Sequence, residues 1–211
     1  MLEQFIKNRI IAQLPFEANE GQVELLDKLS QFIVSPTPRK AFVLRGYAGT
    51  GKTSIMAALV GALQQLQQRI VLLAPTGRAA KVLSKYARVP AYTIHKYIYR
   101  ARTKGAPSLE ARGDEAIRRE ARGERQAFTL RDNLHKNTLF IVDEASMISG
   151  LRDNPIFGSG NLLDDLVKFV YSSEGCSLLL LGDDAQLPPV GSDLSPALSE
   201  DYIAGYQLDT Q

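Results

Sequence analysis

The 211-residue sequence predicts an α/β domain, a parallel β-sheet with helices on both of its faces. Apolar runs of strand length alternate with segments whose apolar residues recur at helical spacing. The apolar runs are nearly continuous, which is typical of parallel strands buried on both faces. A glycine-rich loop joins the first run to a helix, as in α/β proteins that bind phosphate groups. With 45% hydrophobic residues, the chain can bury a substantial core, most simply as one domain.

Two helices are expected before the first strand. The first covers residues 2–12 and ends before Pro15, because proline disfavours helical geometry in the residue that precedes it. Asn19 is a suitable N-cap for the second helix, with Gln22 three residues further on. The apolar stripe of this helix consists of Val23, Leu25, Leu26, Leu29, Phe32 and Ile33.

Strands and helices alternate in the rest of the chain. Strands are expected at residues 41–45, 69–75, 138–144 and 177–184, so the sheet has at least four strands. Helices are expected at residues 53–66, 77–87 and 93–100, and Thr93 can cap the last of them. This alternation predicts the parallel sheet.

The segment at residues 100–126 departs from this pattern. It contains eight basic and five acidic side chains and almost no large apolar residue, so it cannot belong to the core. Two interpretations stay open, a solvated and partly helical insertion or an arm that contacts nucleic acid. A small hairpin is expected over residues 128–134, because a polar stretch lies between the apolar residues Phe128, Leu130 and Leu134.

Composition narrows the class of protein without indicating a partner. The formal charge of +2 is too small to predict nucleic-acid binding by itself. No apolar stretch is long enough to span a membrane, and the N-terminal segment carries charges at helical spacing, unlike a secretory signal. The single cysteine, Cys176, cannot form an internal disulfide and is expected to pack against an apolar strand. A cytoplasmic location is therefore expected.

The glycine-rich loop carries the strongest chemical signal. Gly46 and Gly51 are followed by Lys52 and Thr53 with the spacing of a P-loop, between a predicted strand and a predicted helix. Backbone N–H groups of such a loop cradle phosphates, Lys52 adds a positive charge, and the Thr53 hydroxyl is suited to hold Mg²⁺ on the nucleotide. The predicted nucleotide-binding residues are Gly46, Tyr47, Ala48, Gly49, Thr50, Gly51, Lys52, Thr53 and Ser54.

Two adjacent carboxylates follow the apolar run at residues 138–142. Asp143 is placed to anchor the Mg²⁺ shell, and Glu144 can polarise the attacking water as a general base. The alternative is that both carboxylates only solvate the end of the strand. Together with the P-loop, the pair favours an ATPase over a kinase.

A third candidate, Gln186, follows the last predicted strand. It is expected at the edge of the sheet where open α/β sheets bind ligands. Because a neutral amide can donate to a phosphate oxygen and orient a water, Gln186 is the candidate γ-phosphate sensor. The alternative is a surface loop residue.

Five segments resemble, in this order, motifs I, Ia, Ib, II and III of superfamily 1 helicases, most closely the RecD-like branch. They are GYAGTGKTS, VLLAPTGRAAKVL, TIHKYIY, LFIVDEASMIS and LLLGDDAQLPPVG, and the resemblance covers about residues 16–193. It implies a RecA-like motor domain, ATP with Mg²⁺ as the fuel, single-stranded DNA as the track, and 5′ to 3′ movement. Gln22 resembles the family's Q motif, which reads adenine; the alternative is that Gln22 only completes a capping box with Asn19.

The resemblance also implies residues that contact DNA. They are Pro75, Thr76 and Arg78 in motif Ia, and Thr93, His95 and Lys96 in motif Ib. Independently of the family, Thr76 can cap a helix whose N-terminal amides suit a backbone phosphate. For His95, on an apolar helix, the alternative is a packed histidine.

The sequence departs from the family after motif III. Nothing in it matches motifs IV, V and VI, which the family carries on a second RecA-like domain that supplies arginines to the γ-phosphate. We therefore expect residues 1–211 to be the first motor domain (1A) with N-terminal helices, a single-stranded DNA partner, and a second RecA-like domain elsewhere in the same parent chain. Without those arginines, this chain alone is expected to hydrolyse ATP slowly.

The insertion at residues 100–135 lies where the family has its small 1B subdomain. Two other functions stay open. One is a nucleotide-gated binding module that does not unwind DNA, and the other, less favoured, is a P-loop phosphotransferase.

Overall fold

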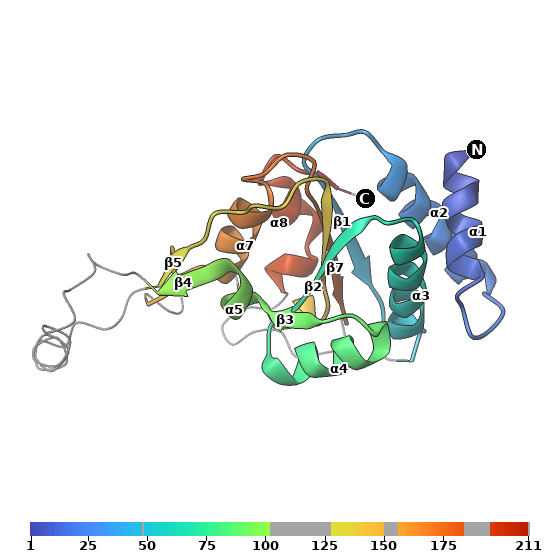
Figure 1. Ribbon diagram of the computed structural model, residues 1–211, viewed down its shortest axis with the longest axis horizontal. Helices are drawn as coiled ribbons and strands as arrows, with labels where there is room; N and C mark the ends of the chain where they lie inside the picture. Colours follow the sequence, from blue (N-terminus) through green and yellow to red (C-terminus); the bar gives the residue numbers. More distant parts are fainter. Residues whose placement is uncertain (48, 102–127, 150–155, 184–194, 211) are drawn as a thin grey trace, which may run out of the picture.

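The structure, a computed structural model, describes residues 1–47, 49–101, 128–149, 156–183 and 195–210. Its described residues form a six-stranded sheet in the order β3-β2-β6-β7-β1-β8 (Figure 1). The strands are β1 (Lys40–Arg45), β2 (Arg69–Ala74), β3 (Ala91–Thr93), β6 (Thr138–Val142), β7 (Ser177–Gly182) and β8 (Asp209–Thr210). All neighbouring strands in this sheet are parallel, so the predicted fold class is confirmed.

The two edge strands, β3 and β8, were not predicted from the sequence. They have three and two residues, which is too short for any apolar period to be recognised. Each is defined by its backbone pairing with a longer neighbour, β3 with β2 and β8 with β1.

Helices cover both faces of the sheet, as Figure 1 shows. One face is covered by α1 (Leu2–Ile11), α2 (Glu20–Val34), α3 (Lys52–Gln65) and α4 (Gly77–Ala87). The other is covered by α5 (Ile94–Ile98), α7 (Leu162–Val170) and α8 (Glu200–Ala204), with the 3-10 turns η2 (Ala145–Met147) and η3 (Pro196–Leu198). Successive strand residues point to opposite faces, so Phe42 and Leu44 pack with the first group of helices and Val43 with the second.

The helix predicted over residues 93–100 is too long. α5 ends at Ile98, and the chain continues as strand β4 (Tyr99–Ala101). β4 pairs antiparallel with β5 (Phe128–Leu130), so the two strands form a short ribbon beside the main sheet (Figure 1). Pairing with a segment distant in sequence decides the conformation here, and it overrides local helical spacing.

The hairpin predicted over residues 128–134 is therefore also wrong. Its first strand pairs with β4 rather than with the residues that follow it. The Leu134 side chain is 89% exposed, and Leu134 does not belong to a strand. Residues 102–127, which make up most of the predicted insertion, lie outside the described part of the chain.

A buried carboxylate, Asp165 of α7, anchors the ribbon to the domain. The Tyr99 hydroxyl donates to Asp165 Oδ2 over 2.7 Å, and the Ser159 N–H donates to the same oxygen over 2.9 Å. Burial, and then the hydrogen bond to Asp165, raise the pKa of Tyr99 far above its usual value, so its proton stays on the hydroxyl. Phe128 stacks on Phe157 with ring centroids 4.6 Å apart, which closes the other side of the junction.

Replacing Tyr99 with phenylalanine should lower the free energy of unfolding by about 1.5–3 kcal/mol, since Asp165 loses a charge-assisted hydrogen bond in a buried site. Urea unfolding followed by circular dichroism measures the change. Tyr92→Phe is the matched control, because Tyr92 is 40% exposed and loses only a hydroxyl. Equal stabilities for the two variants would show that the Asp165 contact does not hold the ribbon.

Candidate functional site

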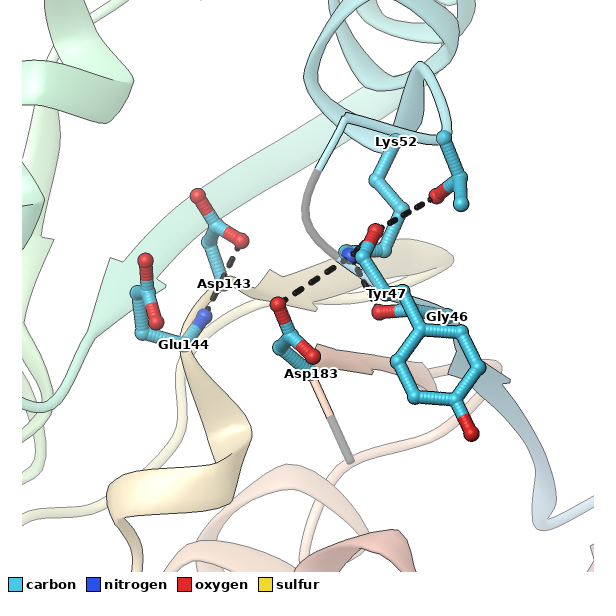
Figure 2. A network of polar contacts seen from close by, with 7 residues as sticks. Gly46, Tyr47, Lys52, Asp143, Glu144 and Asp183 are labelled. Atoms are coloured by element: carbon cyan, nitrogen blue, oxygen red, sulfur yellow. Dashed lines mark hydrogen bonds and ion pairs between the residues drawn. The ribbon is translucent and has the colours of Figure 1, made fainter. Parts of the chain in front are cut away.

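Three loops meet at the carboxyl edge of the sheet. Strands β1, β7 and β6 lie side by side, with Arg45 paired to Gly182 and Val142 paired to Leu180. The P-loop follows β1, Asp143 and Glu144 follow β6, and Asp183 follows β7. Figure 2 shows these residues around one common space.

The P-loop has a backbone that only glycine accommodates at two positions. Gly49 and Gly51 have φ values of 81° and 90°, in the left-handed region. A Cβ atom on Gly51 would lie 2.8 Å from Gln22 Nε2, so the Gln22 amide would have to move if Gly51 carried a side chain. Gly51 is the N-cap of α3, which places the first amides of that helix at the loop, where a phosphate can bind.

Lys52 points into the loop, as Figure 2 shows. Its Nζ donates to the carbonyl oxygen of Tyr47 over 2.7 Å and to that of Gly46. The same Nζ is 3.9 Å from Asp183 Oδ2. The Thr50 hydroxyl also donates to the Tyr47 carbonyl, over 2.8 Å. The loop therefore brings the ammonium group to the place where the motif predicts phosphates.

Asp143 and Glu144 lie at the end of β6. The Glu144 N–H donates to Asp143 Oδ1 over 3.0 Å, and the Asp143 N–H donates to the carbonyl of Leu73 in β2. Burial raises the pKa of Asp143, although the Glu144 N–H and the Lys52 charge act against that change. Glu144 has a φ of 56°, which is uncommon for a non-glycine residue and is found preferentially at functional sites.

Asp183 lies at the candidate site, although it was not among the predicted site residues. Its carboxylate is buried beside Lys52, and its strand lies between the P-loop strand and the Asp143 strand. A signal was present in the sequence, because Asp183 follows a buried strand in the same way as Asp143 does. Strand order, which the sequence did not give, decides that both carboxylates reach the same space.

Gln22 connects α2 to the P-loop. Its side chain accepts from the Asn19 N–H, and Asn19 Oδ1 accepts from the Gln22 N–H, so the capping box is present. Gln22 Nε2 also donates to the carbonyl of Thr50 over 3.2 Å. Capping is therefore not the only contact of this side chain, and contact with adenine stays a prediction.

The residues that match motifs Ia and Ib lie at the neighbouring part of the same edge. Ala74 at the end of β2 pairs with Thr93 at the end of β3, so the two motifs are adjacent. Thr76 caps α4 by accepting from the Ala79 N–H over 3.2 Å, and Thr93 caps α5 by accepting from the Lys96 N–H. Pro75 is half-buried, whereas Arg78 and Lys96 are exposed.

His95 has the surroundings of a packed histidine. Its ring centroid is 5.0 Å from that of Phe157 and 5.8 Å from that of Tyr99. Burial lowers the pKa of His95, so the ring is less readily protonated than a free imidazole. These contacts agree with the packed alternative, and a contact of His95 with DNA stays a prediction.

The oxygen atoms at this edge fit a magnesium ion. Thr53 is exposed in the first turn of α3, and Asp143 offers a half-buried carboxylate. Among the described residues, no cluster of three or more His, Cys, Asp or Glu is suited to a metal. Mg²⁺ needs no such cluster, because one or two protein oxygens are enough when phosphates and waters complete its shell.

Two predicted site residues, Ala48 and Gln186, lie outside the described part of the chain. Ser54 is half-buried in the first turn of α3. The predicted phosphate and carboxylate residues that are described thus lie together, beside the predicted DNA contacts.

This fold and this site define a P-loop NTPase domain of RecA-like type. A family model described as an AAA domain matches residues 17–209, and the chain belongs to that family. It is a RecA-like domain of the superfamily 1 helicase type, as the motifs imply. Within the described ranges, no helix has both the length and the apolar character needed to cross a bilayer.

Known proteins similar to this chain include two helicases. The chain is 28% identical over 178 residues to the ATP-dependent RecD2 DNA helicase of Deinococcus radiodurans, covering 83% of this chain and 19% of that protein. It is 29% identical over 172 residues to the ATP-dependent DNA helicase PIF6 of Trypanosoma brucei brucei, covering 79% of this chain and 18% of that protein. The chain thus spans less than a fifth of the length of either relative.

Among solved structures, the Pif1 helicase from Candida albicans matches with a TM-score of 0.43 and 21% sequence identity. The match covers 84% of this chain and 34% of that one.

Proposed function

We propose that this chain is the first motor domain of an ATP-dependent DNA helicase that moves along single-stranded DNA. One observation carries the proposal: the nucleotide residues and the residues of motifs Ia and Ib occupy neighbouring loops of one sheet edge. β6, which ends at Asp143, pairs with β7 on one side and with β2 on the other. A conformational change at the phosphate site can therefore reach the loop after β2 through β6 alone, because β6 is the neighbour of β2. Movement from 5′ to 3′ is part of the proposal by analogy with the RecD-like branch.

Each side chain at the phosphate site has a task in this proposal. Lys52 neutralises charge on the β- and γ-phosphates of ATP, and Gln22 reads the adenine. Thr53 and Asp143 hold Mg²⁺, which when bound would neutralise phosphate charge. Glu144 accepts a proton from the attacking water as general base. Gln186 is assigned the γ-phosphate contact from its motif alone.

The nucleic-acid side of the proposal rests on exposed groups at the ends of β2 and β3. Arg78 and Lys96 offer positive charges, and the capped N-terminus of α4 at Thr76 offers backbone amides. In this proposal these groups contact backbone phosphates, so binding should be independent of DNA sequence.

Binding of nucleotide and of single-stranded DNA should be coupled. We expect a non-hydrolysable ATP analogue with Mg²⁺ to change the Kd for a fluorescein-labelled oligo(dT) by at least about fivefold, the lower end of typical coupling between sites. Fluorescence anisotropy measures both constants, and Lys52→Ala should abolish the change while leaving nucleotide-free DNA binding in place. A Kd that the analogue leaves unchanged would contradict the proposed motor.

A further inference from the structure

An exposed aromatic side chain, Phe16, lies in the connection between α1 and α2. Leu14 and Ala18, on either side of it in the sequence, pack against the buried cluster beneath α1, α2 and α3. Phe16 itself is 40% exposed. A single exposed apolar residue is common on protein surfaces, so exposure alone indicates no function. What the ring contacts therefore decides what it can do.

The Phe16 ring lies beside the P-loop. A Cβ atom built on Gly51 would be 3.7 Å from Phe16 Cζ and 2.8 Å from Gln22 Nε2, so the ring and the amide border the same point of the loop. The ring approaches this point with Cζ, its outermost atom. In Figure 1 the connection between α1 and α2 lies on the same side of the domain as the start of α3. Phe16 was not among the predicted site residues.

The Gln22 amide can form hydrogen bonds beyond those that hold it in place. Its Oε1 accepts from the Asn19 N–H over 3.1 Å, and its Nε2 donates to the Thr50 carbonyl over 3.2 Å. An amide oxygen has two lone pairs and an amide nitrogen two N–H groups, so each atom can make one bond more. One edge of adenine offers an N–H donor beside a ring-nitrogen acceptor, and a glutamine can bind both at once.

A ring beside such an amide suits a nucleotide base. Bases stack on aromatic side chains through their flat faces, whatever the base. The P-loop fixes the phosphates, and the base of the same nucleotide then lies at one border of the loop. A partner protein could also cover an exposed phenylalanine, but it would not account for an amide held at the P-loop next to the ring.

We propose that Phe16 stacks on the adenine of the bound nucleotide while Gln22 binds the edge of that base. The inference rests on the proposed function and adds to its ATP site a residue outside the helicase motifs. Stacking on Phe16 supplies affinity for a base, and the Gln22 amide supplies the preference for adenine.

The test compares ATP with tripolyphosphate, which has the phosphate chain but no base. Calorimetric titrations with each ligand and Mg²⁺ use the full 211-residue chain. Phe16→Ala should weaken ATP binding by about 5- to 150-fold and leave tripolyphosphate binding unchanged, whereas Phe16→Tyr keeps the ring and should retain ATP affinity. Phe5→Ala is the matched control, because Phe5 of α1 is 44% exposed, and it should match the wild type with both ligands.

A fluorescent variant tests the stacking directly. The chain contains no tryptophan, so Phe16→Trp introduces a single indole at the proposed base site. ATP should quench the emission of this variant by stacking on the indole, and tripolyphosphate should leave it unchanged. Phe5→Trp places the same fluorophore on α1, where ATP should not alter the emission.

Each failure has a separate meaning. If Phe16→Ala binds both ligands like the wild type, the ring does not contact the base and the inference is wrong, while the proposed function stands. If Phe16→Ala weakens both ligands equally, the ring supports the P-loop and the inference is again wrong. An indole emission that ATP leaves unchanged, although calorimetry shows ATP bound, also overturns it. If the folded wild type binds neither ligand, the nucleotide part of the proposed function is wrong as well.

Discussion

In the parent chain with its proposed second motor domain, replacing Glu144 with glutamine should reduce ATP turnover by about 10²- to 10⁴-fold and leave ATP affinity nearly unchanged, because a general base acts on the attacking water and not on the bound nucleotide. The isosteric amide keeps the backbone N–H that donates to Asp143, so the fold of the loop is retained. Single-turnover hydrolysis of labelled ATP gives the rate, and calorimetric titration with a non-hydrolysable analogue gives the affinity.

Asp143→Asn is the matched comparison for this prediction. The carboxylate of Asp143 is assigned to Mg²⁺. Loss of this carboxylate should therefore also lower the affinity for the nucleotide–Mg²⁺ complex and raise the Mg²⁺ concentration needed for binding. Equal losses of affinity in the two variants would contradict this division between base and metal ligand. An unchanged rate in Glu144→Gln would remove Glu144 from the reaction.

Replacing Lys52 with alanine should weaken ATP binding by about 10- to 150-fold, which corresponds to a charged hydrogen bond of about 1.5–3 kcal/mol. Lys52 binds carbonyl oxygens of its own loop and lies beside Asp183, so its ammonium is already held where the phosphates are expected. Calorimetric titration with ATP and Mg²⁺ measures the loss, and circular dichroism checks that the fold is intact.

The control for this variant is Lys28→Ala, which removes an exposed lysine of α2 that pairs with Glu24, one helical turn away. It should bind ATP like the wild type. If Lys52→Ala also binds ATP with wild-type affinity, Lys52 does not contact the nucleotide and the P-loop assignment is wrong.

The local elements that carry the candidate site could be predicted where they are defined over a few consecutive residues. The loop from Gly46 to Thr53 combines the glycine spacing, a lysine and the start of a helix within one short stretch of sequence. Gly49 and Gly51 indeed have left-handed backbones. Asp143 and Glu144 directly follow a buried apolar run, so their place at a strand end needed no knowledge of the partner strands.

Features that depend on pairing between distant segments were missed or misassigned. β5 was given a local partner although it pairs with β4 across residues 102–127. β3 and β8 are too short to be recognised without the strands they extend.

The sequence by itself determined the class of this protein: an α/β fold, a phosphate-binding loop, an acidic strand end and the motifs of superfamily 1 helicases. These features are local, and local patterns of glycine, charge and apolar residues constrain the backbone directly. Only the tertiary structure decided that Asp183 lies beside Lys52, that Gln22 reaches the P-loop, and that the segments matching motifs Ia and Ib lie at the ends of paired strands. Those contacts join residues far apart in the chain, and they depend on the order and register of strands, which packing of the whole core selects.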